Sequence, residues 1–153
     1  MAERAGKQPG SWVSEQAARL AAGHDPAVGR WSRGALDKLR ALGFDVVQDI
    51  RRAGEGNVGH LVSGPSGVFV VETKRREYDA WHLRKAKRQA ARLAAELGVW
   101  VTPVICLALR RPRQPYCDHG VWILGREMLA DWVTTQRNEV VEPGRLARLA
   151  DGA

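Results

Sequence analysis

The sequence has few cysteines and no long apolar run, and both features limit the kind of protein it can encode. Its two cysteines, Cys106 and Cys117, allow one disulfide at most. Cys106 lies inside an apolar segment, so we expect two reduced thiols. No apolar run reaches the roughly 20 residues of a transmembrane helix, and the first residues lack the apolar core of a signal peptide. These absences predict a cytoplasmic protein that does not bind membranes.

Several familiar catalytic patterns are also missing. The sequence has no glycine-rich phosphate loop and no nucleophile and histidine at a recognised spacing. Cys117, Asp118 and His119 could each bind a metal, but adjacent side chains do not easily face one ion and zinc sites use spaced pairs. We expect this run to be a loop.

Basic residues outnumber acidic ones. The 153 residues include 24 Lys and Arg against 17 Asp and Glu, a net charge of +7, which favours an anionic partner, with simple solubility as the alternative. The excess is concentrated in one segment, where only Glu77 and Asp79 oppose eight basic residues: Lys74, Arg75, Arg76, Arg84, Lys85, Lys87, Arg88 and Arg92.

Hydrophobic periodicity and turn residues predict an α/β fold with a mixed central sheet flanked by helices. We expect helices at 32–42, 79–97 and 126–133, strands at 44–50, 58–62, 68–73, 99–109 and 121–124, and loops at 51–56 and 110–118. The first three strands should form a meander, and a helical crossover should make 99–109 parallel to 68–73. The main domain would span 30–135, between a helical arm at 1–29 and a tail at 136–153. The arm could pack on the domain or form a homodimer with a second copy.

Apolar stripes and capping residues indicate how the two longer helices are placed. Asp79 is a suitable N-cap for the second helix, and Gln89 lies at the margin of its apolar face. The first helix should bury Ala35, Leu36, Leu39 and Leu42, and the second Ala86, Ala90, Leu93, Ala94 and Leu97. Four tryptophans in expected elements should be mostly core: Trp81, Trp100, Trp122 and Trp132. Trp31 or Trp81 could instead stack on a base.

The segment 57–74, NVGHLVSGPSGVFVVETK, reads as two strands joined by a tight turn. Alternation places Val68, Val70, Glu72 and Lys74 on one face of the second strand and Phe69, Val71 and Thr73 on the other. A partly buried carboxylate is costly unless it is paired, hydrogen-bonded or bound to a metal. Glu72 and Lys74 are therefore candidate functional residues.

This segment resembles the core of the NERD (nuclease-related) domain, a branch of the PD-(D/E)xK nuclease superfamily. The match runs without a gap from His60 to Lys74 and extends more loosely over 30–133. The resemblance implies a restriction-endonuclease-like core, a Mg²⁺-dependent phosphodiester hydrolase and nucleic acid, DNA above all, as partner. It also implies that Glu72 and the carbonyl of Thr73 bind the metal, and that Lys74 orients or deprotonates the attacking water.

Further roles follow from the same resemblance. Gln89 matches the family's glutamine in the helix after the strand. The basic residues next to this strand could, apart from the resemblance, form either a solvated helix face or a nucleic-acid surface that includes Arg75, Arg76, Arg84, Lys85 and Arg88. One departure is important, because Gly59 stands where the family has a metal-binding Asp. The family's acidic residue in the first helix is also missing. Asp49 or Glu55 could replace these ligands, or Glu72 and Lys74 could pair with each other without a metal.

Three hypotheses follow. The protein could be a Mg²⁺-dependent endonuclease with a rearranged metal site, a nuclease-fold module that binds nucleic acid without cutting it, or a scaffold with no nucleic-acid role. Metal-dependent cleavage separates the first two, and salt-sensitive DNA affinity separates the second from the third. The sequence favours a nucleic-acid-processing domain with a degenerate metal site.

Overall fold

The computed structural model describes residues 26–47, 50–52, 56–138 and 140. Most of the expected arm and tail lies outside these residues, as do Asp49 and Glu55. The elements are α2 (Pro26–Ala41), β1 (Asp45–Val47), β2 (Ile50–Arg52), β3 (Gly56–Val58), β4 (His60–Gly64), β5 (Gly67–Lys74), α3 (Ala80–Leu97), β6 (Val101–Leu107), β7 (Tyr116–Asp118), β8 (Val121–Gly125), the 3-10 turn η1 (Arg126–Met128) and α4 (Leu129–Thr135).

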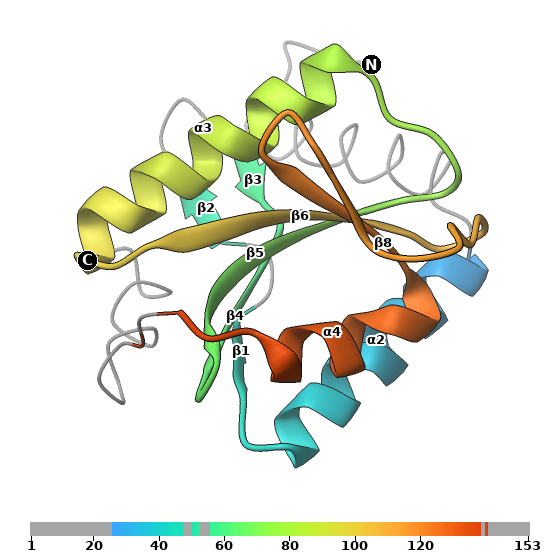
Figure 1. Ribbon diagram of the computed structural model, residues 1–153, viewed down its shortest axis with the longest axis horizontal. Helices are drawn as coiled ribbons and strands as arrows, with labels where there is room; N and C mark the ends of the chain where they lie inside the picture. The colour runs from blue at the N-terminus through green and yellow to red at the C-terminus, as the bar shows by residue number, and fades with distance from the viewer. Residues whose placement is uncertain (1–25, 48–49, 53–55, 139, 141–153) are drawn as a thin grey trace, which may run out of the picture.

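Six strands form a mixed sheet in the order β1-β4-β5-β6-β8-β7. Strands β1, β4 and β5 form the expected antiparallel meander, β6 runs parallel to β5, and β8 runs parallel to β6. Helix α3 covers one face of the sheet, and α2 and α4 cover the other (Figure 1). The predicted α/β class with a helix-flanked mixed sheet is therefore confirmed. Among the described helices, none has the length and apolar character to span a membrane.

Strand β5 lies in the middle of this sheet and supplies apolar side chains to both faces. Val68 and Val70 pack against α3, in a cluster that includes Leu93 and Leu97 of that helix. On the other face, Phe69 and Val71 belong to the core formed with α2 and α4, where Phe69 meets the ring of Trp132 edge-on at 5.7 Å. The predicted alternation is thus confirmed. Burial ends at Val71, after which Glu72, Thr73 and Lys74 are partly exposed.

Several expected element boundaries were wrong. Helix α2 begins at Pro26 rather than residue 32, since proline is suited to the first position of a helix. The strand expected at 44–50 ends at Val47 in the main sheet, and Ile50 begins a separate antiparallel hairpin of β2 and β3. This hairpin occupies part of the expected 51–56 loop. The strand expected at 58–62 is divided at Gly59, and β7 forms inside the expected 110–118 loop.

Some burial expectations were also wrong. Leu42 follows the end of α2 and is 49% exposed, because the chain turns at Gly43, which has a φ of +94°. Trp81 and Trp100 are 53% and 56% exposed, whereas Trp132 is buried as expected. Both cysteines are free thiols, as predicted, with Cys106 buried and Cys117 exposed.

We expect Leu39→Ala to lower the free energy of unfolding by about 2–5 kcal/mol, because Leu39 is fully buried under the sheet. The matched change Leu42→Ala, three residues later, should cost less than about 0.5 kcal/mol. Urea unfolding followed by circular dichroism measures both values. Equal losses would contradict this assignment of the buried face of α2.

Candidate functional site

The start of α3 is closed by a reciprocal cap between Asp79 and His82. The side chain of Asp79 accepts a hydrogen bond from the backbone N–H of His82 at 3.0 Å. The imidazole Nδ1 of His82 accepts one from the backbone N–H of Asp79 at 3.1 Å. Asp79 is thus the N-cap that the sequence predicted, and His82 takes the place that Glu or Gln usually has in a capping box.

Glu72 and Lys74 lie on the α3 side of the sheet, as alternation predicted, and Lys85 from the second turn of α3 joins them. The Nζ atom of Lys85 lies 3.9 Å from Oε2 of Glu72, and both side chains keep 23% of their surface exposed. Burial lowers the pKa of Lys74, Glu72 opposes this shift, Lys85 adds to it, and Asp79 opposes it more weakly. Lys74 and Lys85 therefore both lie near the carboxylate of Glu72.

Lys85 also contacts an aromatic ring. Its Nζ lies 5.4 Å from the ring centroid of Trp81, one turn earlier on α3, a distance typical of a cation–π contact. The ring of Trp81 meets that of His82 edge-on at 5.3 Å. Lys85 is held between an indole face and a carboxylate. Sequence reasoning placed Lys85 only on the nucleic-acid surface, although its spacing of four residues from Trp81 indicated a contact on one helix face.

Gly59, between β3 and β4, lies directly against Glu72. A Cβ atom at residue 59 would come within 2.7 Å of Oε1 of Glu72 and closer still to the carbonyl oxygen of Val71. The second contact is with backbone, so a side chain here requires β4 or β5 to shift. Position 59 therefore faces the carboxylate, as expected of the family's metal site, but it is closed to any side chain in this backbone arrangement.

The described residues do not fit a divalent metal ion. Mg²⁺ prefers several oxygen ligands, whereas this site has the carboxylate of Glu72 and the backbone of Thr73, with no side-chain oxygen at Gly59. The ammonium of Lys85 already lies beside Glu72. Nowhere in the described part of the chain do three or more His, Cys, Asp or Glu side chains cluster so that they could hold a metal.

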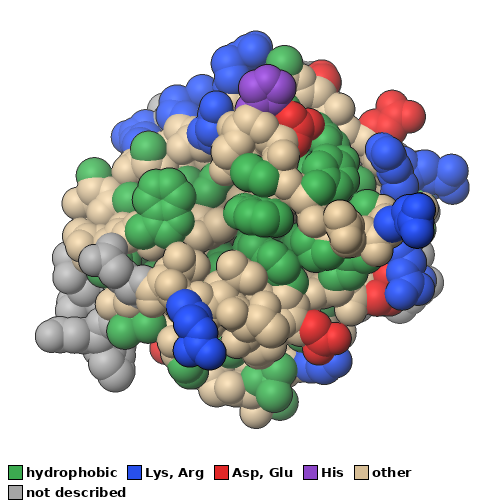
Figure 2. All heavy atoms as spheres, viewed as in Figure 1, with side chains coloured by type: hydrophobic (Ala, Val, Ile, Leu, Met, Phe, Trp, Pro, Cys, Tyr) green, Lys and Arg blue, Asp and Glu red, His purple; other side chains and the backbone are tan. Residues whose placement is uncertain are grey.

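The other predicted site residues lie around this centre. Gln89 is on α3 one turn after Lys85 and is only 2% exposed, so it faces the sheet more fully than its marginal position suggested. Arg75 and Arg76 follow β5 and are exposed, as are Arg84 and Arg88 on α3. In Figure 2, Lys and Arg side chains gather along the top of the molecule, where α3 lies in Figure 1.

A tyrosine and carboxylate network, which the sequence did not reveal, joins the start of α3 to β7. The hydroxyl of Tyr78 donates to Oδ2 of Asp118 at 2.7 Å and lies 2.9 Å from the hydroxyl of Tyr116. Burial and these two hydrogen bonds strongly raise the pKa of Tyr78. Tyr78 and Asp118 are 40 residues apart, so no local pattern could have indicated this contact.

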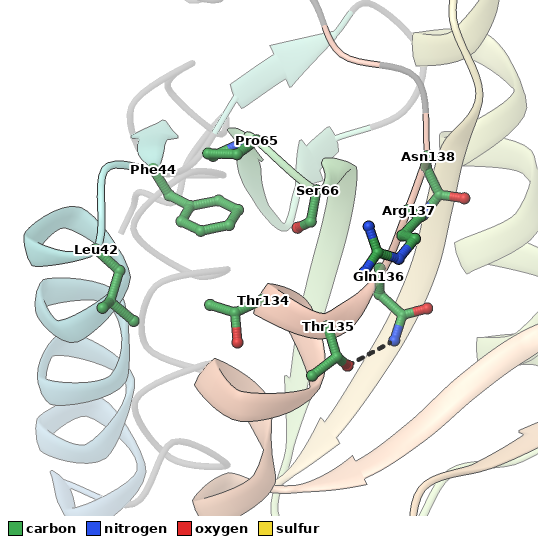
Figure 3. Close-up of a pocket in the computed structure, with 9 residues that line it drawn as sticks. All are labelled: Leu42, Phe44, Pro65, Ser66, Thr134, Thr135, Gln136, Arg137 and Asn138. Atoms are coloured by element: carbon green, nitrogen blue, oxygen red, sulfur yellow. Dashed lines mark hydrogen bonds between the residues drawn. The ribbon is translucent and has the colours of Figure 1, made fainter.

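The structure also has an open pocket of about 780 Å³, which lies away from Glu72 and Lys74. It is formed at the turn between β4 and β5 and at the end of α4, and Figure 3 shows Phe44, Ser66 and Thr134 around it. The hydroxyl of Ser66 donates to the carbonyl of Val133, which joins the turn to α4. Because this turn is the opposite end of β5 from Glu72, the pocket is separate from the candidate site.

Comparison with known proteins identifies the family. A partly buried Glu-x-Lys at the end of a central strand, followed by a basic helix, is the arrangement expected of a nuclease-type α/β domain. The model of the nuclease-related domain (NERD) family matches residues 29–108, just over half of the chain. The chain therefore belongs to the nuclease-related domain family.

Two solved structures are similar to part of the chain. The EndoMS-dsDNA2 complex is 20% identical, with a TM-score of 0.37, over 67% of this chain and 38% of that one. A repair endonuclease from Pyrococcus abyssi is 18% identical, with a TM-score of 0.40, over 70% and 42%. This chain thus spans about two fifths of each. No curated protein matches it in sequence.

We expect Lys74→Met to raise the pKa of His82. Burial is the main cause that lowers this pKa, the charge of Lys74 lowers it further, Asp79 raises it, and Lys85 lowers it again. An NMR titration of the imidazole would measure the change, and Lys87→Met is the matched control from the same helix. An unchanged pKa in the Lys74 variant would show that Lys74 does not lie near His82.

The same shift gives an expected pH dependence. The unfolded chain binds a proton at His82 more readily than the folded chain, so the free energy of unfolding should fall as the pH drops below about 6.5. Lys74→Met should weaken this fall, because it brings the two pKa values closer together.

We expect Gly59→Ala to lower the free energy of unfolding by about 1–3 kcal/mol, because its Cβ would meet the backbone of Val71. Gly34→Ala is the matched control. A Cβ at residue 34 of α2 meets nothing within 4 Å, so alanine should stabilise the helix by about 0.5–1 kcal/mol. Thermal unfolding would measure both, and wild-type stability in the Gly59 variant would contradict the close approach.

Proposed function

We propose that this domain is a nucleic-acid-processing module that binds DNA along α3 and brings a backbone phosphate to the end of β5. The observation that carries the proposal is the convergence of Lys74 and Lys85 on Glu72 at a partly exposed strand end. Membership in the nuclease-related family supports the same placement. Phosphate groups are the feature of DNA that such ammonium groups recognise.

The surface next to this centre has the charge and the shape that the proposal needs. Five side chains lie within an arc of about 100° on α3, by the geometry of an α-helix. We call them the basic flank: Trp81, Arg84, Lys85, Arg88 and Arg92. Four of the five are exposed and Lys85 is partly so. A basic helix face with one exposed aromatic ring can contact phosphates and stack on a base or a sugar.

A further question is whether the domain cleaves the DNA that it is proposed to bind. The resemblance assigns Mg²⁺ to the site, with Glu72, Lys74 and Gln89 as catalytic residues. Gly59, however, has no side chain, so it cannot supply the second carboxylate that would bind the metal together with Glu72. Incubation with plasmid and linear DNA and Mg²⁺ or Mn²⁺ tests this directly. Cleavage that Glu72→Ala or Lys74→Ala abolishes would make the domain an endonuclease. A homodimer through residues 1–29 and a cytoplasmic location stay predictions from the sequence.

We expect the protein to bind duplex or single-stranded DNA with an affinity that falls steeply with salt, because counterions leave the phosphates on binding. The double variant Arg84→Glu, Arg88→Glu should weaken binding strongly and flatten the salt dependence. Lys38→Glu is the control, since Lys38 is exposed on α2 on the opposite face of the sheet. Fluorescence anisotropy with labelled oligonucleotides measures all three proteins.

Equal losses in the double variant and in Lys38→Glu would mean that net charge alone drives binding. The absence of salt-sensitive binding to any DNA or RNA probe would instead support the scaffold hypothesis.

A further inference from the structure

The ammonium of Lys85 lies beside the carboxylate of Glu72, the residue that the family resemblance assigns to the metal. Lys85 comes within 3.9 Å of Glu72, and Gly59 supplies no second carboxylate on the other side of Glu72. A metal ion bound at Glu72 would be repelled by Lys85 and, among the described side chains, would gain one carboxylate only. The donor set therefore favours an ammonium over Mg²⁺ as the cation that neutralises Glu72.

The backbone of α3 and two side-chain contacts determine where the ammonium of Lys85 lies. Its backbone belongs to α3, whose start is fixed by the Asp79 and His82 cap. Its ammonium lies over the ring of Trp81 and next to Glu72, and its side chain is 23% exposed. A lysine held by two contacts has lost most of its rotamer freedom before a ligand binds, so a ligand does not have to order it again.

Two ammonium groups, those of Lys74 and Lys85, lie near the carboxylate of Glu72. Glu72 is the carboxylate that acts most strongly on Lys74, and Asp79 acts on it more weakly. The two ammonium groups would attract a further anionic group. A phosphodiester carries a single negative charge and offers two free oxygens as hydrogen-bond acceptors. Ammonium groups bind phosphate as compact charges with several donors each.

We propose that Glu72, Lys74 and Lys85 form a metal-independent binding site for one phosphodiester of the nucleic-acid backbone, with Lys85 in the place of the metal ion. This inference rests on the proposed function and names the chemistry by which the same site would recognise its ligand. Glu72 then competes with the phosphate for the two ammonium groups and does not contact the phosphate itself.

The first test compares DNA affinity in EDTA with affinity in Mg²⁺ at equal ionic strength. The two affinities should agree for the wild-type protein. Lys85→Met should weaken binding about tenfold and reduce the slope of log affinity against log salt by about 1. Lys85→Arg should keep most of the affinity. The matched control Lys87→Met removes one charge from the same helix, about 200° away from Lys85, and should cost much less.

The second test uses Glu72→Gln, for which the two accounts predict opposite signs. In a lysine-based site, removal of the carboxylate leaves both ammonium groups free for the phosphate, so affinity in EDTA should stay equal or rise. In a metal site, the same change removes the main ligand, so binding or cleavage that depends on Mg²⁺ should be lost. Loss of affinity in Glu72→Gln, or binding that requires a metal, would overturn the inference.

A third readout is independent of DNA. Electron paramagnetic resonance can count the Mn²⁺ ions bound to the wild-type protein and to the Glu72→Gln variant. The two counts should be equal. A Mn²⁺ ion that binds the wild type and is lost in Glu72→Gln would overturn the inference by itself. The proposed function fails in a different way, by the absence of salt-sensitive nucleic-acid binding with or without metal. The two failures can therefore be told apart.

Discussion

The candidate site depends on the need to neutralise a carboxylate at the end of a buried strand. Strand β5 is apolar on both faces as far as Val71, so Glu72 emerges directly from the core with less than a quarter of its side chain exposed. A carboxylate in this position needs a cation or hydrogen bonds close by. The parallel crossover through α3 brings Lys85 to it, and Asp79 caps the start of that helix six residues before Lys85.

The same constraint explains why Gly59 matters. Strand β4 pairs with β5 beginning at His60, which lies opposite Val71, so the preceding residue comes against the backbone of Val71 and the side chain of Glu72. In a metal-binding arrangement an acidic side chain at this position would share an ion with Glu72. Here the two strands are too close for a side chain at residue 59, and the ammonium of Lys85 from α3 lies beside Glu72.

Much of this fold could be predicted from local sequence pattern. The apolar runs of β5 and β6 reflect burial on both faces of the sheet, and the stripe of α3 reflects burial on one face of a helix, so period and composition were sufficient. The separate β2 and β3 hairpin was missed because residues 51–56 are rich in charge and glycine, which is typical of a loop. The exposure of Leu42 depends on the turn at Gly43, which a helical stripe does not encode.

The candidate site was predictable only in part. Glu72 and Lys74 follow from strand alternation, and the likeness to nuclease-related domains added Gln89 and Gly59. The contact between Lys85 and Glu72 could not be read from the sequence, because it depends on how α3 lies over β5. The network of Tyr78, Tyr116 and Asp118 depends on the same long-range packing.

The most direct test of this account is a crystal structure of the protein with a short DNA oligonucleotide in the presence of Mn²⁺, with anomalous diffraction used to locate the metal. The account predicts a backbone phosphate between the ammonium groups of Lys74 and Lys85, and no manganese peak within coordination distance of Glu72. A manganese ion bound to Glu72, with Lys85 displaced from the carboxylate, would contradict it.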